Sequence, residues 1–204
     1  MSTQAVPLKA EQLANQIIRE ASRFVGLREV KPNSQWDNPS TPGPDAALVL
    51  ELRTLMRPVP WEEGWAYCAA FAEASVRAAL IRLNITPAEA DRFLKVMGPG
   101  VLASFNAFKK LGLTTSAPSA GAIWFAQHGT TDQGHAGIVT GASAGGALMN
   151  TIEGNTSLDS KDARKDREGD WITTRTFDAK GRGTLHTLGF LPASAILKLI
   201  SAPH

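Results

Sequence analysis

The chain has 204 residues, 43% of them hydrophobic and 20% charged, which predicts one globular domain over 1–204 with a sizeable core. A net charge of +2 is too small to indicate a nucleic-acid-binding protein, and a single cysteine excludes an internal disulfide framework. No segment reads as a signal peptide or a membrane span. We therefore expect synthesis in the cytoplasm, no membrane insertion, and access to any outside target through lysis or dedicated export.

The first half of the chain predicts helices. After a flexible tail over about 1–8, a core over about 10–200 begins with an amphipathic helix that ends at Gly26. A polar, turn-rich loop should follow over 28–44. Three further helices are expected apart from the one around Cys68, and they cover 46–55, 87–96 with Thr86 as cap, and 101–111.

Cys68 is predicted to lie in the first turn of another helix. Phe71, Ala74 and Ala78 recur at spacings of three and four after it, and Pro87 cannot continue the same helix. Unpaired N–H groups and the positive end of the helix dipole favour a thiolate there and can hold an oxyanion. The alternative for Cys68 is a small buried hydrophobe among alanines.

Large aromatic side chains surround this cysteine in the sequence. Trp61 and Trp65 precede it and Tyr67 is adjacent to it. Such residues either line a groove beside a nucleophile or pack into the core.

From Pro118 onward the pattern alternates, which predicts strands. They cover 122–125, 135–141, 147–155, 171–177 and 184–191, and a closing helix covers 192–200. A run of mixed charge over 157–170 predicts a solvated loop, with a lid or a substrate-reading loop as the alternatives. The fold class is therefore α+β, with N-terminal helices followed by an antiparallel sheet against which the cysteine helix packs.

The second and third strands should form a hairpin that brings polar residues together. If Gly141 faces Ala147, His135 lies opposite Glu153, and a shift of two residues places it opposite Asn155. A thiolate nucleophile needs a neighbouring base, and that base needs a third group to orient it. Cys68, His135 and either Glu153 or Asn155 supply one residue for each role.

Three segments of the chain resemble the CHAP family, the cysteine, histidine-dependent amidohydrolases/peptidases. They are Ala-Tyr-Cys-Ala-Ala-Phe over 66–71, Gly-His-Ala-Gly-Ile-Val over 134–139 and Thr-Ile-Glu-Gly-Asn-Thr over 151–156. With a similar opening segment over 24–29, the resemblance extends over roughly 15–177. It implies a single CHAP-like catalytic domain with a papain-like fold that cleaves bacterial peptidoglycan, either as an N-acetylmuramoyl-L-alanine amidase or as an endopeptidase.

The resemblance also assigns roles to residues. It implies Cys68 as nucleophile, His135 as base, Glu153 as orienting acid and Asn155 as a further polar member of the site. Tyr67, Trp65 and Trp61 would contact substrate, with Tyr67 shaping the oxyanion pocket. The family's frequent Gly-Asp pair is replaced by Gly-Ala at 121–122, and the calcium-binding carboxylates of some phage members are not evident over 61–67. We therefore expect no metal and no cofactor.

Several alternatives stay open at this point. The missing export signal favours a phage lysin or a secreted antibacterial effector, which would be accompanied by an inhibitor or immunity protein, over a housekeeping hydrolase. The chain could instead be a non-catalytic wall-binding module, a pseudoenzyme or a cysteine-dependent acyltransferase. A zinc site from Cys68, His135 and Glu153 would lack the close-spaced ligand pair typical of such sites.

Overall fold

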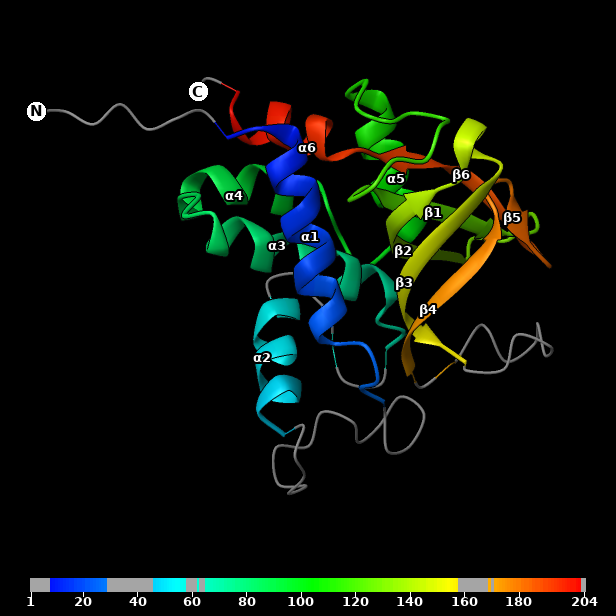
Figure 1. Cartoon of the computed structure of the whole chain (residues 1–204), viewed down its shortest axis with the longest axis horizontal. Coiled ribbons are helices and arrows are strands. Elements are labelled where there is room, and N and C mark those ends of the chain that lie inside the picture. The colour runs from blue at the N-terminus through cyan, green and yellow to red at the C-terminus, as the bar shows by residue number, and fades with distance from the viewer. Residues whose placement is uncertain are drawn as a thin grey trace, which may run out of the picture.

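The computed structural model describes residues 8–28, 46–57, 62, 65–157, 169 and 171–202. A group of helices lies beside a curved antiparallel sheet (Figure 1). The helices are α1 (Ala10–Arg23), α2 (Ala46–Met56), α3 (Cys68–Arg82), α4 (Pro87–Leu94), α5 (Val101–Lys110) and α6 (Ala193–Ile200). The strands are β1 (Ile123–His128), β2 (Gly134–Ala142), β3 (Leu148–Thr156), β4 (Trp171–Asp178), β5 (Gly181–Arg182) and β6 (Leu185–Leu191). The α+β class is confirmed.

Local sequence signals set the helix ends. Thr86 caps α4 by accepting a hydrogen bond from the N–H of Glu89, whose carboxylate accepts one from the N–H of Thr86. Gly26 follows α1 with a φ of +96°, a conformation that glycine adopts at little cost. None of the described helices is long and apolar enough to cross a membrane.

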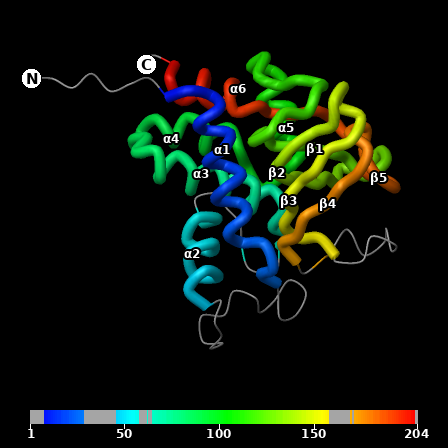
Figure 2. Tube along the Cα trace, in the orientation of Figure 1, coloured from blue at the N-terminus to red at the C-terminus, as the bar shows by residue number. Residues whose placement is uncertain are grey.

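The six strands form one sheet in the order β4-β3-β2-β1-β6-β5, and every pair is antiparallel. Its two edge strands, β4 and β5, are consecutive in the chain and are separated only by Ala179 and Lys180. So short a connection brings the two edges together, and the sheet curls into a half-barrel (Figure 2). The two-residue strand β5 was not among the predicted strands.

Each face of the sheet has its own core. The face toward the helices carries Ile123, Phe125, Ile138 and Ile152, which belong to the main hydrophobic cluster. The opposite, inner face carries a smaller cluster that includes Trp124, Val139, Met149 and Phe190. The alternation along each strand therefore separates a helix-covered face from an inner face that also holds the polar residues described below.

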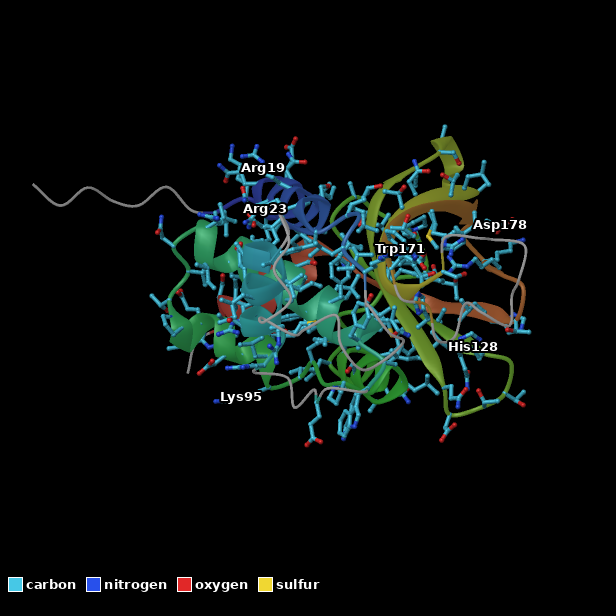
Figure 3. All side chains as sticks on the ribbon, turned by 90° about the horizontal axis from the view of Figure 1, so that it is seen from below. Arg19, Arg23, Lys95, His128, Trp171 and Asp178 are labelled. Atoms are coloured by element: carbon cyan, nitrogen blue, oxygen red, sulfur yellow. The ribbon has the colours of Figure 1, made fainter. Side chains whose placement is uncertain are left out.

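The chain after α1 extends the sheet at the β4 edge. Arg28 forms an isolated bridge with Trp171, and the N–H of Gly26 donates to the carbonyl of Ile172. The Arg28 guanidinium also lies 5.3 Å from the centre of the Trp171 ring. Trp171 therefore lies where the helices meet the sheet, as Figure 3 shows.

The predicted hairpin forms, but the first of its two proposed registers is wrong. The hairpin closes between Ser143 and Leu148 rather than between Gly141 and Ala147. Ile138 therefore pairs with Ile152 and Val139 with Thr151, with a bulge after Val139. Continued along the strands, this register places Gly137 opposite Glu153, which is the alternative with a shift of two residues.

Four predictions fall wholly or mainly outside the described residues. They concern the tail over 1–7, most of the loop over 28–44, most of the charged run over 157–170, and Trp61.

Candidate active site

Cys68 is the first residue of α3, so its predicted place in the first turn of a helix is confirmed. Close packing of this helix end against β3 fixes the position of the sulfur. A Cβ atom at Gly154 would lie 2.8 Å from both the Phe71 Cβ and the Tyr67 Cε2, closer than carbon atoms approach. Glycine at 154 therefore lets the start of α3 lie directly against the strand that carries Glu153.

His135 and Glu153 are joined across β2 and β3. The His135 Nε2 lies 2.8 Å from the Glu153 Oε2, and both side chains are buried, with 3% and 0% of their surface exposed. The absence of a side chain at Gly137 makes this contact possible, since a Cβ there would lie 2.7 Å from the Glu153 Cγ. The carboxylate lies over Gly137 and reaches His135 diagonally, rather than from the opposite position.

Glu153 accepts hydrogen bonds from three side chains. Besides His135, the Thr151 hydroxyl donates to Oε1 at 2.6 Å. Arg182 of β5 donates from Nη1 to Oε1 and from Nη2 to Oε2, each at 2.8 Å. An ionised carboxylate can only accept, so the His135 Nε2 carries a proton and Nδ1 remains for Cys68. Glu153 therefore selects the tautomer in which His135 can act as a base toward the thiol.

The charges of the site depend on these contacts. Burial raises the pKa of the Cys68 thiol, but hydrogen bonding and positive charge from His135, with the backbone of Ala136 and Ala69, lower it below its ordinary value. Burial lowers the pKa of His135, whereas Cys68 and Glu153 raise it to about 9. The arrangement thus favours a thiolate and imidazolium pair near neutral pH.

The pKa of Glu153 responds to the same opposing influences. Burial raises it, and the hydrogen bonds and charges of His135 and Arg182 bring it far below the ordinary range. The carboxylate therefore stays ionised although it has no contact with solvent.

Asn155 is buried on β3 two residues after Glu153, but the strand is irregular there. Its φ is +56°, and the pairing with β4 shifts between Glu153 and Thr156. A bulge of this kind interrupts the alternation of faces, so parity along the strand does not decide whether Asn155 shares a face with Glu153. Its role in the site stays a prediction.

The predicted aromatic residues have different environments. Tyr67 is fully buried at the N-cap of α3, and its ring packs near Gly154. Trp65 is 46% exposed and lies three residues before Cys68, and its contact with substrate stays a prediction. Trp61 lies outside the described residues.

Sequence reasoning missed Arg182. It lies in a two-residue strand that shows no periodicity, 29 positions from its carboxylate partner. The arginine itself carries no local signal, because only the curl of the sheet brings it to Glu153. Across the described ranges, no group of three or more histidine, cysteine or carboxylate side chains is placed to hold a metal ion.

In comparisons with known proteins, no family model, curated protein or solved structure matches this chain.

Proposed function

We propose that the chain is a cysteine-dependent hydrolase of an amide bond in bacterial peptidoglycan, with a papain-like arrangement of the CHAP type. The observation that carries the proposal is the connected set of Cys68 at a helix start, His135 on β2 and Glu153 on β3. Each residue has the neighbour that its chemical role requires: the thiol a base, and the base an ionised carboxylate. The resemblance of three sequence segments to the CHAP family suggests the substrate.

In the proposed mechanism, the Nδ1 of His135 takes the Cys68 proton and the thiolate attacks the amide carbonyl carbon. The first N–H groups of an α-helix have no backbone acceptor within it, and those at the start of α3 can stabilise the oxyanion that forms. The C–N bond then breaks, and the leaving amine takes the proton from His135. Water activated by His135 hydrolyses the thioester and restores the thiol.

Digestion of purified peptidoglycan tests this proposal. Wild type and Cys68→Ala are incubated with it at neutral pH, and soluble products are identified by mass spectrometry. New fragments from the wild type alone are expected, and their masses identify the amidase or endopeptidase bond. Parallel digestions with and without an added amine separate hydrolysis from acyl transfer, since a transferase would couple the amine at low concentrations at which a hydrolase still releases acids.

Alkylation of Cys68 separates a wrong substrate from a wrong mechanism. The chain has one cysteine, so iodoacetamide labelling reports on that thiol alone. Fast labelling at pH 6 to 7 without peptidoglycan cleavage would support an activated cysteine and show that peptidoglycan is not the substrate. Labelling that follows an ordinary thiol pKa of about 8.5 would overturn the catalytic pair itself.

A further inference from the structure

Glu153 is held by an arginine from the far edge of the sheet. Arg182 lies in β5, the last strand in the order β4-β3-β2-β1-β6-β5, whereas Glu153 lies in β3 near the other end. We infer that Arg182 is a positioning residue for the Cys68 and His135 pair, acting by orienting Glu153 and by balancing the buried charges. The inference rests on the proposed function only in taking Cys68 and His135 as the reacting pair.

The geometry of the contact fixes the carboxylate in orientation as well as in position. Two parallel N–H groups of Arg182 each donate to a different oxygen of Glu153, both at 2.8 Å. Such a two-pronged pair restricts rotation of the carboxylate plane, which a lysine, with one ammonium group, cannot do. The Oε2 held in this way is the atom that contacts His135, so the orientation passes directly to the imidazole ring.

Aromatic side chains hold Arg182 itself. Its guanidinium lies 4.7 Å from the Phe177 ring centre and 5.9 Å from that of Trp124. The Trp124 indole donates to the Thr187 hydroxyl at 2.9 Å and meets His135 edge-on at 5.8 Å between ring centres. One tryptophan thus contacts both the arginine and the histidine, which explains how the two stay in a fixed relation.

The backbone of the hairpin formed by β5 and β6 fixes the position from which the Arg182 side chain extends. Gly181 has a φ of +128°, and a Cβ there would lie 2.0 Å from the Leu185 carbonyl oxygen. Glycine is therefore required for the tight turn that pairs Arg182 with Leu185. The side chain leaves this turn with 14% of its surface exposed.

Charge balance gives Arg182 its second role. When the Cys68 thiolate and His135 imidazolium form, Cys68 and Glu153 are negative while His135 and Arg182 are positive, so the buried set is neutral. Without Arg182 the set carries one uncompensated negative charge, which burial makes costly. Among the described residues, the charged groups with the largest influence on the pKa values of Cys68, His135 and Glu153 are one another and Arg182.

The test is the pH dependence of Cys68 alkylation by iodoacetamide, which needs no knowledge of the substrate. R182M keeps an unbranched side chain against Phe177 and removes the charge. The two limbs of the profile, which follow the pKa values of Cys68 and His135, should therefore both move to higher pH. We expect the midpoint of each limb to rise by about one pH unit, equivalent to about a tenfold change in each acid dissociation constant. Lys180→Gln is the matched control, because it removes an exposed positive charge from the same hairpin and should leave both limbs unchanged.

Two further variants separate electrostatic positioning from packing. E153Q leaves Arg182 as an uncompensated positive charge, so its limbs should move to lower pH, opposite to R182M. R182K retains the charge but not the two-pronged contact, so its limbs should match the wild type while peptidoglycan digestion slows about tenfold, equivalent to about 1.4 kcal/mol.

If the limb midpoints of R182M lie within about 0.3 pH units of those of the wild type, the charge role is overturned, because the expected shift is about one unit. A shift in the Lys180→Gln control equal to that of R182M would overturn it as well. If circular dichroism shows that R182M does not fold, the R182K variant tests the proposal instead. Peptidoglycan digestion by R182K at the wild-type rate would overturn the positioning role. If wild-type protein alkylates rapidly but digests nothing, the substrate is wrong, and the limb positions still test Arg182.

Discussion

Among the described residues, the carboxyl groups of Glu153 and Glu73 have no exposed surface, and their surroundings make the first ionised and the second neutral. Glu153, on the inner face of the sheet, accepts hydrogen bonds from Thr151, His135 and Arg182, and its pKa is far below the ordinary range. Glu73, in the middle of α3, has no hydrogen-bond partner for either carboxylate oxygen among the described residues. Burial raises its pKa to about 8, and the charge of Arg77 only partly opposes this.

The difference shows that burial alone makes a carboxyl group neutral, whereas convergent donors keep it ionised. Arg77 lies one turn after Glu73, but its guanidinium donates to the carbonyls of Thr54 and Leu55 at the end of α2. Glu73 is thus a protonated side chain in a packed region near neutral pH. On the inner face of the sheet, in contrast, three side chains donate hydrogen bonds to one carboxylate. Such an arrangement is expected where the charge has a function.

The largest expected effect comes from removing the charge of Glu153. Glu153→Gln leaves Arg182 buried without its counter-ion and removes the acceptor that orients His135. We expect peptidoglycan turnover to fall about 100-fold or more and unfolding free energy to fall by about 3 kcal/mol. Chemical denaturation and digestion rates measure the two effects, and retention of wild-type values in both would show that the ion pair is incidental.

The same substitution at Glu73 should instead stabilise the protein at alkaline pH. Because the folded pKa of Glu73 is raised above its unfolded value, the folded state binds an extra proton between these values, and stability is lost as pH rises through this window up to about 8. Glu73→Gln removes that loss. Its stability relative to wild type should rise by about 1.4 kcal/mol per pH unit between about pH 5 and 8. Parallel stability curves for the two proteins would contradict a raised pKa.

The route by which Glu153 reaches His135 can be blocked without changing any charge. Gly137→Ala places a methyl group 2.7 Å from the Glu153 Cγ, so the carboxylate must move. We expect a loss of about 2 kcal/mol in stability and about tenfold in turnover, from strain and misplacement together. Gly141→Ala is the matched control, because a Cβ there meets only the Asn150 side chain at 4.0 Å. Equal effects of the two substitutions would contradict the steric argument.

The smallest expected effect comes from removing a single donor. Thr151→Val deletes the hydroxyl that donates to Glu153 at 2.6 Å and keeps the side-chain shape. One hydrogen bond to a charged group contributes about 1.5 kcal/mol, so stability should fall by that amount while Arg182 and His135 keep the carboxylate ionised. Turnover should change only a few-fold. A loss as large as that of Glu153→Gln would mean that Thr151, rather than Arg182, determines the charge state.

Local patterns in the sequence predicted much of the fold. Proline, glycine and capping residues end or begin helices through backbone constraints that act within one turn, so the ends of α1, α3 and α4 lie close to where they were expected. The alternation after Pro118 predicted most of the strands for the same local reason. The placement of Cys68 at a helix start, and of His135 and Glu153 on adjacent strands, also followed from these patterns.

Only the tertiary structure decided how these residues meet. The hairpin register depends on where Ser143 and Leu148 close the turn, and the diagonal contact of Glu153 depends on the space above Gly137. Arg182 reaches Glu153 because the sheet curls until its edges approach, a property of all six strands together. The partners that folding supplies likewise decide that Glu153 is ionised and Glu73 neutral, since both are buried and a carboxyl group in sequence carries no record of those partners.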